Sequence, residues 1–385
     1  MVTENQKKPR NIIFWVNFTY FIMLCLLIGV QILSKTVLSK HLSDLELDFV
    51  FALIVQIGIM FIIPLTAFSL IKRQKVGRTL KDFKVNKISF KHVLMSFGIG
   101  VCVFFLNLCV ASFFNAIILA LGYESLPSSA GSGISATFGN FLLVTFYSAM
   151  LPGICEEITH RGMLLNGLKK QGLAKALVLS SLMFGLMHLN INQFFYAFIV
   201  GLVIGFIAIC ANSIIPAMIV HFTNNFINNY LDFASVNGWF GGDFYNLVNS
   251  ARESTEPLSV MLISILGITL VVTLFIFLIK KLLLERRGEQ IDAKTREIVL
   301  NEMLSENVKN GDFSEMNPVV VAQNINEVKE KTLDLMLNKN KYLSFEMFND
   351  EKDIQKPTLA TNIFFYASIV MASVMTVFTF VWGVL

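Results

Sequence analysis

The chain has 385 residues, of which 55% are hydrophobic, and its mean hydropathy is +0.64. The apolar residues gather in long runs, which excludes an ordinary soluble domain and favours membrane-spanning helices over the alternating strands of a barrel. The formal net charge of +4 does not indicate nucleic-acid binding, because the basic residues stand in short blocks beside apolar runs, where they orient spans and attract anionic lipid.

The apolar runs predict an all-α polytopic membrane protein, a bundle of about nine transmembrane helices with a cytoplasmic helical insert. The predicted spans in chain order are Ile12–Leu33, Phe49–Ile71, Val93–Leu121, a fourth from Phe138 towards Lys169, Ala176–Leu189, Phe194–Cys210, Ile214–Leu231, Leu258–Ile279 and Ile363–Leu385. Pro64 and the Pro152-Gly153 pair should disturb the second and fourth of these helices.

The chain divides at its polar segments. Residues 1–283 form a bundle of eight spans with a catalytic core at about 138–231, residues 284–360 form the polar insert, and residues 361–385 form a last span. The segment Lys72–Lys91 holds eight Lys or Arg residues and is the strongest cytoplasmic marker. We therefore expect a multi-pass protein of the cell membrane with its N-terminus in the cytoplasm and its C-terminus outside.

The five cysteines all lie within apolar runs, and none forms a CxxC pair. They indicate buried thiols rather than a disulfide framework or a cysteine-ligated metal.

The stretch from Cys155 to Gly162 carries the chemistry of the chain. Charged side chains at membrane depth are costly and mark functional sites. Glu157 and Arg161 are four residues apart and can pair on one helix face, whereas Glu156 is turned about 100° away. Arg161 can thus neutralise Glu157 and leave Glu156 as a general base. The alternative is a structural Glu-Arg clasp between helices.

Histidines supply the next candidates. His188 ends the apolar segment that begins at Phe184, and taken alone it is more often a packing residue. His160 can hydrogen-bond Glu156 one turn back or face lipid headgroups. If the spans simply alternate, Glu156 and His188 lie near opposite membrane faces. They meet only if the fourth helix continues past Glu156 and the short fifth helix stops early.

The seventh span adds His221 and Asn225, four residues apart on one face, and Asn228 and Asn229 extend this polar stripe. The alternative for the asparagines is hydrogen bonding between helices. The chain has neither a GxSxG nor an HExxH motif. We expect no cofactor, although a glutamate and two histidines are known zinc ligands, and Glu156, His188 and His221 would be that set.

Three short motifs together resemble those of the CPBP intramembrane proteases, which include type II CAAX prenyl proteases and Abi or bacteriocin-immunity proteins. The motifs are Glu156-Glu157-xxx-Arg161, Phe184-xxx-His188 and His221-xxx-Asn225. The resemblance covers about residues 138–229. It implies a metal-independent glutamate protease in which Glu157 and Arg161 orient the site.

By the same resemblance, Glu156 and His188 would activate the attacking water, and His221 and Asn225 would form the oxyanion hole. The function expected is hydrolysis of peptide bonds in a membrane-associated, prenylated or other peptide substrate. The partners expected are a peptide or lipidated peptide, membrane lipids and unidentified proteins that bind the 284–360 insert, with no nucleic acid. The alternatives are a non-catalytic peptide-binding or immunity protein and an ion-coupled transporter.

Overall fold

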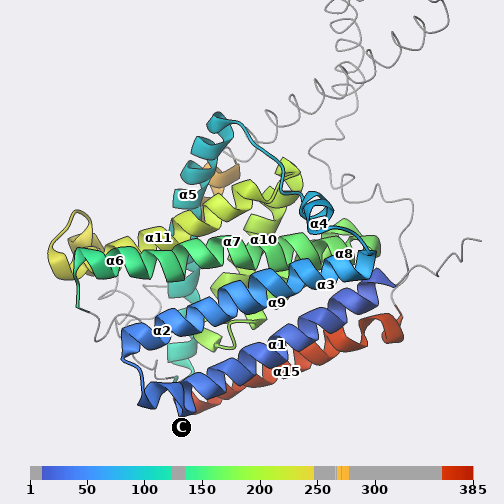
Figure 1. Ribbon diagram of the computed structural model, residues 1–385. Coiled ribbons are helices and arrows are strands. Elements are labelled where there is room, and N and C mark those ends of the chain that lie inside the picture. The colour runs from blue at the N-terminus through green and yellow to red at the C-terminus, as the bar shows by residue number, and fades with distance from the viewer. Residues whose placement is uncertain are drawn as a thin grey trace, which may run out of the picture. The chain divides into compact units, whose positions relative to one another are not determined.

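The computed structural model describes residues 11–123, 135–246, 265, 267–269, 271–276 and 358–384. Most of the predicted span Leu258–Ile279 and nearly all of the predicted insert at 284–360 lie outside these residues. The described residues are folded into helices joined by short turns, and they contain no strand (Figure 1). The expectation of an all-α protein is confirmed for this part of the chain.

The helices follow one another with few interruptions. Those of the first half are α1 (Ile12–Thr36), η1 (Leu38–Lys40), α2 (Asp44–Ala52), η2 (Leu53–Ile62), α3 (Ile63–Lys72), α4 (Val76–Asp82) and α5 (Phe90–Ala120). Those of the second half are α6 (Phe138–Thr145), η3 (Phe146–Met150), α7 (Leu151–Glu157), η4 (Ile158–Leu165), α8 (Asn166–Leu168), η5 (Lys169–Gln171), α9 (Leu173–Leu186), α10 (Ile191–Ala211), α11 (Ile215–Asn237) and α15 (Leu359–Val384).

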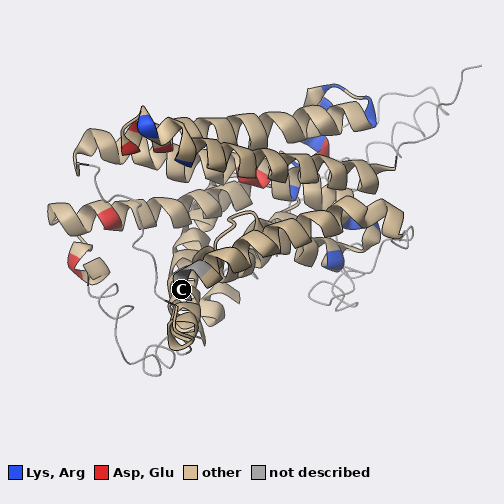
Figure 2. Ribbon diagram, turned by 90° about the horizontal axis from the view of Figure 1, so that it is seen from below, with Lys and Arg blue, Asp and Glu red and all other residues tan. Residues whose placement is uncertain are grey.

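Six helical stretches of the described chain are long and apolar enough to cross a membrane. They are Ile12–Lys40, Asp44–Lys72, Phe90–Ala120, Phe138–Gln171, Ile191–Ala211 and Leu359–Val381. A multi-pass membrane protein is therefore supported, but nine spans are not. Helix α9 has only 14 residues, and α11 is not among the six because its asparagines lower its hydropathy. Figure 2 shows most charged residues near the ends of the described helices and a few midway along them.

Both predicted disturbances coincide with π-helical segments, in which hydrogen bonds skip one more residue than in an α-helix. η2 lies just before Pro64, and η3 and η4 flank the α7 segment that holds Pro152. Proline has no N–H to donate to the carbonyl four residues earlier. Side chains of other helices bond these two carbonyls. Thr159 Oγ1 donates to Met60 O at 2.6 Å, and Asn225 Nδ2 donates to Ser148 O at 3.3 Å.

The first and last described helices, α1 and α15, lie side by side (Figure 1). A buried cluster of three amides joins them to the end of the fourth helical stretch. Asn17 Nδ2 and Gln171 Nε2 each donate to Asn362 Oδ1 at 3.0 Å. Because an unpaired amide is costly to bury, this cluster fixes the register of α15 against α1.

Helix α10 packs closely against α9 through a face of small residues that includes Gly201 and Gly205. A Cβ on Gly201 would come within 3.1 Å of Phe184 Cδ1, and one on Gly205 within 2.5 Å of Leu177 Cδ1. The two glycines thus allow an approach that larger residues would prevent. This approach brings the end of α9, with His188, beside the charged stretch of α7 and η4.

Candidate active site

Glu157 and Arg161 form a completely buried ion pair. Arg161 Nη1 lies 2.9 Å from Glu157 Oε1, and the two side chains are 1% and 0% exposed. The pairing predicted from their spacing is confirmed. Arg161 makes two further contacts. Its Nη2 donates to Gly201 O at 2.7 Å, and its guanidinium lies over the Phe184 ring, 4.7 Å from the centroid. The cation is therefore fixed by three helical segments.

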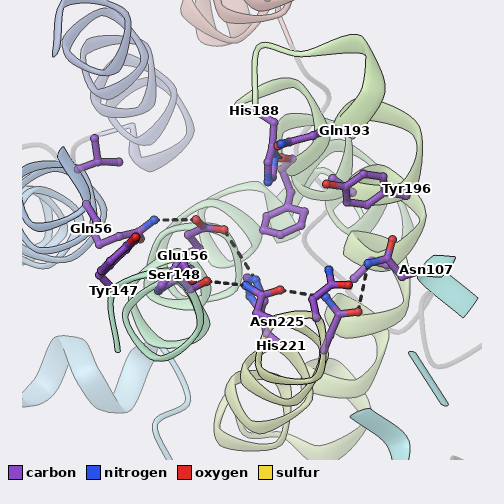
Figure 3. Close-up of a pocket in the computed structure, with 18 of the residues that line it drawn as sticks. Gln56, Asn107, Tyr147, Ser148, Glu156, His188, Gln193, Tyr196, His221 and Asn225 are labelled. Carbon is purple, nitrogen blue, oxygen red and sulfur yellow. Dashed lines mark hydrogen bonds and ion pairs between the residues drawn. The ribbon is translucent and has the colours of Figure 1, made fainter. Parts of the chain in front are cut away.

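Glu156 has a different environment from its neighbour. Its side chain is buried and lines a cavity of about 370 Å³. Gln56 Nε2, from η2, donates to Glu156 Oε1 at 2.9 Å. The second oxygen, Oε2, lies 4.0 Å from His221 Nε2. The two neighbouring carboxylates are thus separated in space: Glu157 pairs with Arg161, and Glu156 faces the cavity (Figure 3).

His221 connects the two carboxylates. Its Nδ1 lies 2.9 Å from Glu157 Oε1, and because an ionised carboxylate only accepts hydrogen bonds, this nitrogen carries a proton. Its Nε2 is directed towards Glu156 at 4.0 Å. A water molecule can lie within hydrogen-bonding distance of both atoms across such a gap, at roughly 2.8 Å from each.

His188 lies in the turn after α9 and lines the same cavity as Glu156 and His221. Its Nδ1 donates to Phe184 O at 2.9 Å, so in the neutral ring Nε2 carries the lone pair. His188 and Glu156 line one cavity because α9 is only 14 residues long. A helix of that length spans about 21 Å at 1.5 Å per residue, which is shorter than a bilayer core of about 30 Å. The early end of the fifth helix, one of the two conditions set by the sequence, is confirmed.

Asn225 is the last of the four predicted catalytic residues, and it also lines the cavity. Its Nδ2 is directed at Ser148 O, and its Oδ1 accepts a hydrogen bond from Asn224 Nδ2 at 2.9 Å. Asn107, from α5, donates to Asn224 Oδ1 at 3.2 Å. The asparagines of α11 therefore make the hydrogen bonds between helices that the sequence offered as an alternative, and Asn224, Asn225 and Asn228 also line the cavity.

Sequence reasoning missed several residues of the cavity wall. They include Asp48, Gln56, Asn107, Tyr147, Gln193 and Tyr196. Gln56 and Asn107 are isolated polar residues within apolar runs, and that pattern at membrane depth was an available signal. Asp48, Gln193 and Tyr196 lie near the start of a helical stretch, where polar residues are ordinary, and Tyr147 is an aromatic residue within an apolar run.

His160 does not reach the cavity. It is fully buried, and its Nδ1 donates to the backbone carbonyl of Glu156, one turn back, at 2.9 Å. Of the two alternatives for His160, the hydrogen bond to Glu156 is the one that the structure has. The Nε2 atom of His160 lies 3.0 Å from the hydroxyl of Tyr20, from α1. This residue supports the helix that carries Glu156.

The geometry does not gather a metal-ligand set among the described residues. No three His, Cys, Asp or Glu side chains of that part of the chain come close enough together to bind an ion. The zinc alternative, with Glu156, His188 and His221 as ligands, is addressed by the chelation experiment below.

A family model matches part of the chain. Residues 138–227 match the family described as type II CAAX prenyl endopeptidase Rce1-like, a segment of about a quarter of the sequence that contains all three motifs. The resemblance to the CPBP and CAAX proteases is therefore confirmed over this segment. No curated protein and no solved structure matched.

Proposed function

We propose that the protein is an intramembrane endopeptidase that hydrolyses peptide bonds through a water molecule activated by Glu156. The observation that carries this proposal is the contrast between two adjacent carboxylates. Glu157 is paired with Arg161, whereas Glu156 lines a polar cavity beside His221. The match of residues 138–227 to a prenyl endopeptidase family supports the same reaction class.

Charge balance supports a role for His221 as a hydrogen-bond donor. Two ionised glutamates and one arginine leave a net charge of −1 in a buried site. A protonated His221 would cancel that charge, with Nδ1–H on Glu157 and Nε2–H directed into the cavity. A developing oxyanion needs donors of this kind. Asn225 would be the second donor, after its amide leaves the long 3.3 Å bond to Ser148 O.

The reaction proceeds in two proton transfers. Glu156, assisted by the Nε2 lone pair of His188, takes a proton from water as the water oxygen attacks the carbonyl carbon of the scissile bond. His221 and Asn225 stabilise the resulting oxyanion. Glu156 then gives its proton to the leaving nitrogen, the C–N bond breaks, and the products are a new carboxyl group and a new amine.

The substrate that fits this site is a peptide segment able to enter the membrane-embedded bundle, either lipidated or simply membrane-associated. No resident cofactor takes part in these steps.

The central experiment compares Glu156→Gln with wild type in a cleavage assay on purified, detergent-solubilised protein. General acid–base groups contribute about 10²- to 10⁴-fold in rate, so activity should fall by at least about 100-fold while folding and membrane insertion are retained. Glu46→Gln is the matched control, because Glu46 is exposed at the start of α2 and glutamine can still cap that helix.

Three other results would point elsewhere. An active Glu156→Gln variant would refute the role of this carboxylate. Loss of wild-type activity with a chelator, and its return with zinc, would support the metal alternative. An absence of cleavage, with solute flux that follows a proton or ion gradient, would favour a transporter.

A further inference from the structure

Apart from His221, whose protonation would offset the charge of the glutamates, the charged groups on the cavity wall are acidic. Asp48 and Glu156 are the two carboxylates among the described lining residues, and neither Lys nor Arg occurs among them. Asp48 belongs to α2 and is exposed, whereas Glu156 is buried. Because a protonated His221 would offset the charge beside the scissile bond, Asp48 is the carboxylate left without a cation among the described lining residues. A negative side chain placed beside Asp48 would meet repulsion, and a cationic one would meet attraction.

Unpaired acceptors add to this preference. Gln56 Oε1 and Asn107 Oδ1 are buried atoms of lining side chains, and neither has a hydrogen-bond partner in the described structure. Both residues are more than nine-tenths buried. Their amide nitrogens are already used, by Glu156 and Asn224 respectively. The wall therefore offers carbonyl oxygens to N–H groups, which peptide backbones and basic side chains both supply.

The position of Asp48 sets a distance from the reacting bond. It precedes Gln56, the residue that holds Glu156, by eight positions on the continuous helical stretch α2–η2. Eight residues of helix span about 12 Å, which an extended peptide covers in three to four residues at about 3.3 Å each. A substrate side chain three to four residues from the scissile bond could therefore reach Asp48.

We infer that the cavity selects peptides with a Lys or Arg residue three to four positions from the cleaved bond, and that Asp48 is the residue that determines this selectivity. The inference rests on the proposed function, since it concerns the substrate of the same site. It assigns Asp48 to substrate binding and gives it no part in the bond-breaking steps.

The test uses end-blocked fluorogenic peptides with the full-length protein in detergent micelles. Each peptide carries Lys, Gln or Glu at one of the positions from two to five residues on either side of the cleaved bond. The readout is the ratio of kcat/KM for the Lys peptide to that for the Glu peptide. Wild type should prefer the Lys peptide about five- to tenfold when the varied residue is three or four positions from the cleaved bond, on one side of it. The preference is no larger because exposed ion pairs are weak.

Variants of Asp48 separate selectivity from a general effect on folding. Asp48→Asn should bring the ratio close to one, and Asp48→Lys should invert it. Asp44→Asn is the matched control, because Asp44 lies one turn earlier on the same helix, is exposed and does not line the cavity. It should keep the wild-type preference for Lys. A lysine at this position is avoided, because it would stand one helical turn from Asp48 and could pair with it. The preference should also weaken as the salt concentration rises from about 0.05 M to about 0.5 M, because salt screens the attraction between exposed charges.

The outcomes distinguish the two proposals. If wild type cleaves no peptide, the proposed function fails. If it cleaves Lys, Gln and Glu peptides equally, or if the Asp44 and Asp48 variants change the ratio to the same degree, the endopeptidase stands and the selectivity inference is overturned.

Discussion

Replacement of Arg161 by methionine tests the buried pair on which the site depends. The side chains of Arg161 and Glu157 are 1% and 0% exposed, so the variant leaves a buried carboxylate without its cation, which costs about 3–5 kcal/mol. It also leaves Gly201 O without the 2.7 Å hydrogen bond from Nη2, which costs about 1–3 kcal/mol. These contributions overlap, and we expect a loss of about 4–6 kcal/mol, a large part of the stability of a typical domain.

The assay is a reversible detergent titration in mixed micelles, followed by circular dichroism. The double variant Arg161→Met/Glu157→Gln removes the charge together with its partner, so it should recover more than half of the lost free energy of unfolding. Arg78→Met is the control, because Arg78 is exposed in α4. The reasoning fails if Arg161→Met lies within about 1 kcal/mol of wild type, or if the double variant is no more stable than the single one.

Three further predictions concern stability in the same titration. Thr159→Val removes the hydroxyl that donates to Met60 O at 2.6 Å and should cost about 1–2 kcal/mol; an unchanged stability would contradict that bond. Asn362→Leu should cost about 2 kcal/mol and increase hydrogen exchange in α15, while equal exchange would show that the amide cluster does not hold this helix. Partial burial raises the pKa of Asp82, but hydrogen bonds, chiefly from Lys72, outweigh it and lower the pKa overall. The stabilisation is thus present above the ordinary pKa of an aspartate and is lost as pH falls through the lowered value. Because Lys72 is 37% exposed, the effect is at most about 1 kcal/mol, and Asp82→Asn should remove it; a variant with the same acid dependence as wild type would refute the assignment.

Local spacing made the centre of the site predictable. Glu157 and Arg161 are separated by one helical turn, and that distance holds in any helix regardless of what surrounds it. The same geometry turned Glu156 away from the pair. His188, His221 and Asn225, the other three residues of the motifs, line one cavity with Glu156, and their catalytic roles stay predictions.

Contacts between distant segments were not predictable from the chain alone. Gln56 is 100 residues from the carboxylate it binds, and His221 is 64 residues from Glu157. The bridging position of His221 between two carboxylates depends on how α11 packs against α7. The sequence pointed to the prolines, but it did not reveal the π-helical form of the neighbouring turns, because hydrophobic periodicity is too coarse to separate i+4 from i+5 bonding.

The amide cluster between α1 and α15 has a consequence for biogenesis. Asn17 and Asn362 are 345 residues apart in the chain, so the ribosome synthesises the whole segment between them before the pair can form. Until then the α1 amide stays in lipid without this partner, which is energetically unfavourable. A translation product truncated before α15 would keep that exposed polar group, a feature by which membrane quality control could recognise an incomplete molecule.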